Sequence, residues 1–218
     1  MLFRSSKFQI SQYLVKPATP ALKTLQCFAG QHWQWDKVQF EVLYPSLESY
    51  QDTTLSDNNK SCVLKVTSQY GSILLTGDIE KQAENLLLQA SQQAQLINHS
   101  NANFDATPQF SLKSDVLTAP HHGSKTSSTL AFIQAVDAKY AVFSVGYLNR
   151  FKHPKDLIEK RYEQNGLHYP DSKNYRSDYH GALIFSFTQT KPLQVQAWRQ
   201  THPKYWHNQV APVKINQQ

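Results

Sequence analysis

Long apolar segments and closely spaced cysteines are both missing from this chain of 218 residues. No stretch approaches the roughly 20 apolar residues that a membrane-spanning helix requires, so the polypeptide taken alone is expected to be soluble. The N-terminal sequence MLFRSSKFQI contains no continuous apolar core, and no cleaved signal peptide is expected. Cys27 and Cys62 form neither a Cys-x-x-Cys metal pair nor a disulfide framework. Both are predicted to be small apolar core residues, and nothing in their spacing calls for an oxidising compartment.

The chain does contain enough apolar material for a folded core. Hydrophobic residues make up 40% of it and aromatic residues 12%, which excludes a disordered protein and allows one domain with or without a tail. Lys and Arg number 22 against 16 Asp and Glu, a formal charge of +6. This positive charge attracts polyanions over long range, so it is compatible with binding to nucleic acid. Charge alone does not establish such binding.

Strand-like and helix-like patterns alternate along the chain, which predicts an α/β fold. Apolar or alternating runs predict strands at residues 38–42, 61–66, 72–76, 116–119, 140–145 and 182–187. Helical spacing predicts helices at residues 79–96, 132–136 and 155–164. Residues 1–30 are predicted to be a connector, and residues 46–60 a polar loop.

Residues 189–218 form a basic segment in which lysines and an arginine alternate with Trp198, Tyr205 and Trp206. Cations beside aromatic rings are typical of a groove that binds single-stranded nucleic acid. The alternative is a partly ordered tail whose aromatic side chains pack back on the domain.

Polar side chains follow several of the predicted strands. Asp78 comes directly after one strand and suits a divalent metal, or else it caps the helix that begins beside it. His121 and His122 follow a second strand, and adjacent histidines point in different directions, so one is expected to ligate a metal while the other forms a hydrogen bond.

A third strand is followed by Asn149, Arg150 and His153, and a fourth is approached by residues 177–181. Arg150 suits a bidentate contact with phosphate, or it is simply an exposed cation. Open α/β folds assemble ligands at the carboxyl edge of the sheet, so these groups are expected to share one site.

The ordered motifs resemble those of ComEC/Rec2-type DNA-uptake proteins. The resemblance runs from about Cys27 to Phe187. The motifs taken together are much more specific for this family than any one of them alone. The residues that carry it are Gly30-Gln31-x-Trp33-x-Trp35-Asp36, Asn59-x-Ser61-Cys62-Val63-Leu64, Leu74-Leu75-Thr76-Gly77-Asp78-Ile79-Glu80, Ala119-Pro120-His121-His122-Gly123-Ser124-Lys125-Thr126-Ser127-Ser128, Ser144-Val145-Gly146 and Asn149-Arg150-x-x-His153-Pro154.

The resemblance implies a metallo-β-lactamase-like αββα domain, two packed sheets with helices outside. In the full-length family this domain is joined to a channel in the bacterial inner membrane that carries single-stranded DNA inward during natural transformation. The implied activity is metal-dependent hydrolysis of the other strand, using two divalent ions, zinc or manganese. By position, Asp78 resembles a metal-binding carboxylate, and His121 or His122 a late histidine ligand, which makes these three the expected catalytic and metal residues. Lys125, Asn149, Arg150 and His153 then contact the substrate phosphates or support the ligands.

The chain departs from the family in lacking the His-x-(His/Asp)-x-Asp-His stretch that supplies most metal ligands. Residues 31–188 are therefore expected to be the C-terminal half of the domain, with the other half lying before Met1 or on a separate polypeptide. The isolated half is expected to be inactive and to expose apolar patches that pair with that partner. The alternative is a catalytically inert DNA-binding or assembly module. A smaller departure is Lys152, where a glycine commonly precedes His-Pro.

Overall fold

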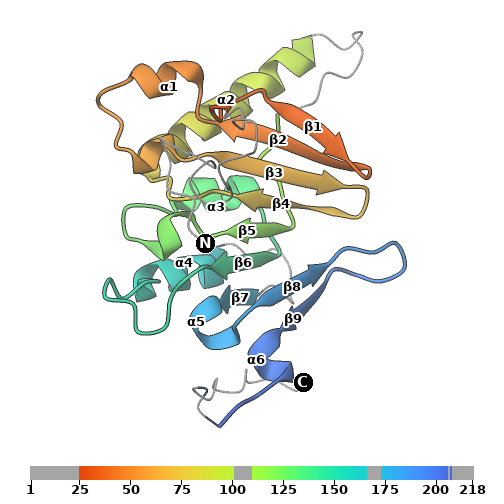
Figure 1. Cartoon of the computed structure of the whole chain (residues 1–218). Coiled ribbons are helices and arrows are strands. Elements are labelled where there is room, and N and C mark those ends of the chain that lie inside the picture. The colour runs from red at the N-terminus through yellow and green to blue at the C-terminus, as the bar shows by residue number, and fades with distance from the viewer. Residues whose placement is uncertain (1–24, 101–109, 166–172, 206, 208–218) are drawn as a thin grey trace, which may run out of the picture.

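The computed structural model describes residues 25–100, 110–165, 173–205 and 207 (Figure 1). Most of the predicted connector and the end of the basic tail lie outside this part of the chain. Within it, no helix is long and apolar enough to cross a membrane.

A seven-stranded sheet in the order β1-β2-β3-β4-β5-β6-β7 forms the centre of the fold (Figure 1). The first four strands are antiparallel neighbours, and β4 through β7 run parallel. The bounds are β1 (His32–Trp35), β2 (Val38–Tyr44), β3 (Val63–Ser68), β4 (Gly71–Leu75), β5 (Val116–Thr118), β6 (Tyr140–Phe143) and β7 (Lys173–Arg176). The parallel strands end at the same edge of the sheet, which is where polar residues were predicted to gather.

One face of the sheet is covered by three helices, α2 (Lys81–Ser100), α3 (Leu130–Val136) and α4 (Asp156–Asn165). Their apolar stripes pack with inward-facing strand residues into one buried core. The largest buried side chains of this core include Leu74 and Phe143 from the sheet and Leu87, Phe132 and Ile158 from the helices.

The described residues cover the opposite face of the sheet only in part. A separate antiparallel pair, β8 (Leu183–Ser186) and β9 (Gln194–Ala197), packs Phe185 within 6.0 Å of the Tyr140 ring. The cross-strand pairing places Phe40, Val66 and Ile73 on this face, followed by Val42, Leu64 and Leu75. On this face, Trp33 and Trp35 of the edge strand β1 are 47% and 70% exposed, and Leu75 at the end of β4 is 37% exposed. We call the surface formed by β1 to β4 on this side the open face.

Most strands and all three long helices occur where the sequence predicted them, including the β3–β4 hairpin at Tyr70 and Gly71. The polar loop predicted over residues 46–60 was wrong in part, because Ser46 caps a short helix, α1 (Leu47–Gln51), and a turn of 3-10 helix, η2 (Asn58–Lys60), follows. β1, β7 and β9 were not predicted. The strand predicted at 182–187 exists as β8, but it pairs with β9 and not with the central sheet. The remaining short helices are η3 (Pro120–Gly123), α5 (Ser177–His180) and α6 (Trp198–Thr201).

Cys27 and Cys62 form a disulfide, so the prediction of two separate core cysteines was wrong. Their Cα atoms lie 6.1 Å apart although 35 positions separate them in sequence. Folding brings them together because the segment before β1 runs back along β2, where Gly30 N–H donates to the Val42 carbonyl, and reaches the start of β3. The bond closes a long loop and fixes the N-terminal edge of the fold to the turn before β3. Disulfides of this kind persist in oxidising compartments.

Replacing both cysteines, Cys27→Ser with Cys62→Ser, is expected to lower the free energy of unfolding by about 3–4 kcal/mol, because a loop of this length regains its freedom in the unfolded chain. Urea denaturation followed by tryptophan fluorescence measures the change. A thiol reductant should shift the wild-type midpoint by a similar amount and leave the double variant unaffected. Equal midpoints for the two proteins would show that the bond contributes nothing.

Candidate active site

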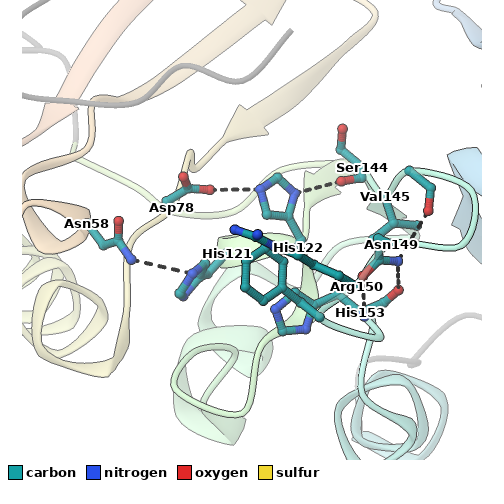
Figure 2. Close-up of a pocket in the computed structure, with 11 residues that line it drawn as sticks. Asn58, Asp78, His121, His122, Ser144, Val145, Asn149, Arg150 and His153 are labelled. Atoms are coloured by element: carbon teal, nitrogen blue, oxygen red, sulfur yellow. Dashed lines mark hydrogen bonds and ion pairs between the residues drawn. The ribbon is translucent and has the colours of Figure 1, made fainter.

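A pocket of about 340 Å³ opens where β4, β5 and β6 end (Figure 2). Asp78 follows β4, the histidine pair follows β5, and the remaining wall comes from the loop after β6. The structure thus brings together all the predicted site residues except Lys125, which does not line the cavity. The lining residues are Asn58, Asp78, His121, His122, Ser144, Val145, Gly146, Asn149, Arg150, Phe151 and His153.

Asp78 and His122 face each other in the pocket, with their Oδ1 and Nε2 atoms 3.1 Å apart. On the other side of the ring, Nδ1 lies 2.6 Å from the backbone oxygen of Ser144. A carbonyl oxygen can only accept, so Nδ1 carries the hydrogen and Nε2 of a neutral ring is an acceptor that faces a carboxylate. Two acceptors at this distance favour either a protonated ring or a cation held between them.

The ring of His121 is held like that of His122, with Nδ1 as the donor and Nε2 as the acceptor, but by different partners. Its Nδ1 lies 3.2 Å from Thr126 Oγ1, and the Thr126 hydroxyl in turn donates to Glu80 at 2.6 Å. Nδ1 therefore donates to the threonine, and Nε2, 3.4 Å from the Asn58 amide nitrogen, is the acceptor. Metal-binding histidines are commonly held in this way, with one ring nitrogen donating to a fixed oxygen.

The backbone of the histidine pair is held in an unusual conformation. His121 and His122 have φ values of 49° and 57°, in the left-handed region that costs an L-residue about 1 kcal/mol or more. Gly123 follows with φ of 77°, and a Cβ there would lie 2.7 Å from Pro154 and 2.8 Å from Phe143. Only glycine fits at this position, and the tight turn it permits points both imidazoles into the pocket.

Asp78 was predicted either to bind a metal or to cap the following helix, and the structure gives the capping role at the start of α2 to Asn59. The Asn59 Oδ1 atom accepts the N–H groups of Glu80 and Ala83 at 3.0 and 3.1 Å. Ser61 Oγ accepts the N–H of Asp78 itself at 3.2 Å. The turn before β3 thus sets the position of Asp78, which gives Asn59 and Ser61 a structural role.

The loop after β6 is closed on itself by Asn149. Its side-chain nitrogen donates to the backbone oxygens of Gly146 and His153, and its Oδ1 accepts the His153 N–H at 2.8 Å. The main structural role of Asn149 is therefore to hold the loop in its closed conformation. Lys152 has φ of 53°, which explains physically why a glycine suits this position in the family.

His153 lies deeper in the pocket than its neighbours in the loop. Burial lowers the pKa of its ring, and the nearby charges of Lys155, His121 and His122 lower it further. Its Nδ1 atom is buried and meets no hydrogen-bond partner among the described residues. The lowered pKa favours the neutral form of the His153 ring.

The segment at residues 177–181 supports the pocket and does not line it. The Ser177 hydroxyl accepts the N–H of Val145 at 2.7 Å and donates to its carbonyl, also at 2.7 Å. Asp178 is buried and pairs with Arg176 at 2.8 Å, outside the cavity. The expectation that this segment adds polar groups to the shared site was therefore wrong for its charged residues.

As a metal site, the described residues fit only in part. Asp78 Oδ1 and His122 Nε2 are separated much as two ligands of a tetrahedral zinc ion, which stand about 3.3 Å apart when bonds are about 2.0 Å long. A catalytic zinc site keeps at least about three protein ligands. In the part of the chain that the structure describes, no group of three or more His, Cys, Asp or Glu residues is placed to hold a metal ion.

No family model matches the sequence. Competence protein ComA of Neisseria gonorrhoeae is 38% identical over 157 residues, which are 72% of this chain and 19% of ComA. Recombination protein 2 of Haemophilus influenzae is 30% identical over 79% of this chain and 18% of its own length. This chain is similar to competence proteins. The uncharacterized protein YcaI of Escherichia coli is 31% identical over 83% of the chain. The chain spans about a fifth of the length of these relatives.

Asn59→Ala is expected to lower the free energy of unfolding by about 2–3 kcal/mol, since two amide groups of a buried helix start lose their acceptor. The neighbouring Asn58→Ala removes a side chain whose one hydrogen bond to His121 is long, and it should cost less than about 1 kcal/mol. Thermal and urea unfolding of both variants measures the difference. Equal costs at the two positions would contradict the assignment of Asn59 as the cap.

Proposed function

We propose that this chain is part of a DNA-uptake protein and that its pocket is one half of a metal-dependent phosphodiesterase site. The observation that carries the proposal is the contact of Asp78 with His122 in a pocket that also holds Arg150 and His153. A carboxylate, oriented imidazoles and a cation that suits phosphate are the groups this chemistry requires. The names of two relatives, a competence protein and a recombination protein, support the role in DNA uptake.

Each pocket residue would have a role set by its position. Asp78 and His122, with His121 beside them, would hold zinc or manganese ions, which supply an activated water and neutralise charge on phosphorus. Ser144 and Thr126 keep both imidazoles in the tautomer that accepts at Nε2. Arg150 would hold a phosphate oxygen at the mouth of the pocket, and the His153 ring would line the pocket beside it.

The missing ligands would come from a second segment packed on the open face. Trp33, Trp35 and Leu75 leave apolar area there that a soluble domain normally covers. In the family that the motifs resemble, a second sheet fills this place, supplied by the same protein or by another polypeptide. The isolated chain would then bind metal weakly and would not cleave DNA.

A second candidate function is an inert DNA-binding or assembly module. The observation that favours it is the shortage of metal donors among the described residues. In that case the basic charge of the chain would matter for binding, and Asp78 and the histidines would only support the turn after β5.

Asp78→Asn tests the hydrolytic proposal in a chimera that joins the flanking N-terminal sequence of ComA from Neisseria gonorrhoeae to this chain. The parent chimera should bind Mn²⁺ or Zn²⁺ by calorimetry and cleave a labelled oligonucleotide. Asp78→Asn should lower the cleavage rate at least about a hundredfold, since even residues that only support metal ligands contribute 10- to 100-fold. The matched control is Asp156→Asn, an exposed carboxylate at the start of α4. Cleavage that survives Asp78→Asn would favour the inert module.

The open face is tested by Leu75→Lys, with Leu157→Lys as its matched control. Both leucines are exposed, but Leu157 lies on α4 on the helix side of the sheet. Leu75→Lys is expected to reduce self-association of the chain and to weaken its capture of the co-expressed flanking segment of ComA at least about tenfold, whereas Leu157→Lys changes neither. Sedimentation velocity and co-purification measure the two effects. Equal self-association and equal capture for the two variants would show that the open face is not the docking surface.

A further inference from the structure

The mouth of the pocket carries a stack of three flat groups. The Arg150 guanidinium carbon lies 4.6 Å from the centre of the Phe151 ring. The Phe151 and His153 rings are nearly parallel, with an angle of 17° and centres 5.9 Å apart. Next in line is the ring of His121, 6.1 Å from that of His153. Figure 2 shows Arg150 and His153 beside the histidine pair.

Phe151 has no part in the core that would explain its presence. Its side chain is 55% exposed, and the same loop exposes Tyr147 at 58% and Leu148 at 81%. Asn149 holds this loop closed, and Lys155 Nζ donates to the Phe151 carbonyl at 2.5 Å, so the backbone that carries the ring is fixed. A large apolar ring held in water by a rigid loop suggests a ligand that covers it.

We propose that Arg150, Phe151 and His153 form a stacked platform, and that a base of single-stranded DNA stacks on the outer face of the Arg150 guanidinium, which Phe151 supports from behind, while its phosphate enters the pocket. This inference rests on the proposed function and adds the substrate class. Flat guanidinium and aromatic faces stack on any nucleobase, and a base can reach them only when it is not paired in a duplex. The neighbouring cations Lys152 and Lys155 suit the backbone on either side of the stacked base.

The same loop has the composition of a membrane-binding loop, with three exposed apolar side chains beside cations. The position of Phe151 favours the nucleic acid. It lines the same cavity as Asp78 and His122, and its ring stacks on His153 inside that cavity. A side chain that inserts into a lipid bilayer would not be expected to line a cavity with these polar groups.

The test uses the full chain in EDTA, so that neither metal nor cleavage contributes. Fluorescence anisotropy compares a labelled oligo-dT of about ten nucleotides with an abasic strand of equal length, which keeps the phosphates and lacks the bases. Wild-type protein should bind oligo-dT at least about fivefold more tightly than the abasic strand. Phe151→Leu keeps apolar bulk without a flat face and should abolish this preference, while Phe151→Trp should retain it.

Tyr70→Leu is the matched control, because Tyr70 is also an exposed ring but lies in the β3–β4 turn at the opposite end of the strands. It should bind both strands as the wild type does. The inference is overturned if Phe151→Leu keeps the preference, if the wild type binds the two strands equally or not at all, or if Phe151→Leu loses binding only to phosphatidylglycerol vesicles. The hydrolytic proposal is judged separately by Asp78→Asn in the chimera, so either can fail alone.

Discussion

The parallel pairing of β4, β5 and β6 is the constraint on which the site depends. It brings three strand ends to one edge, and the pairing continues beyond the strands themselves. Thr76 Oγ1 donates to the Thr118 carbonyl at 2.7 Å, and the His121 N–H donates to the Gly77 carbonyl at 3.1 Å. The turn carrying the histidines is thereby fixed against the turn carrying Asp78, so that their contact is a property of the backbone and not of two flexible side chains.

Beneath this edge, the buried Glu84 carboxylate holds the turn that follows the histidines. It accepts the N–H groups of Ser128 and Thr129 at 2.5 and 2.8 Å, and Tyr162 donates to Ser128 Oγ. Burial raises the pKa of Glu84 and outweighs the hydrogen bonds that lower it. The raised pKa means that this ionised group weakens the fold as the pH rises through it. The two hydrogen bonds offset the destabilisation caused by burying the carboxylate, because the N–H groups of Ser128 and Thr129 would otherwise be buried without an acceptor.

The sequence predicted which residues meet at the strand ends better than it predicted contacts between distant segments. Strand ends are marked locally by residues such as Gly77 and Gly123, and parallel order then places them together. By contrast, the Cys27–Cys62 bond, the cap supplied by Asn59 and the partner of β8 depend on which distant segments meet. Periodicity identified β8 as a strand but could not choose between the central sheet and β9. Phe151 was overlooked as a pocket residue because no polar group marks it.

The proposed metal site and the open face would be two aspects of one feature. Leu75 is the last residue of β4 and its side chain lies on the open face, while Asp78 follows three positions later in the pocket. Three residues span at most about 10 Å of chain. A segment that covers Leu75 therefore comes within reach of Asp78, and its side chains can enter the pocket without any movement of β4. The apolar area would drive the docking, and the docked segment would supply the polar groups that the pocket needs. Stability and metal binding would then be gained together.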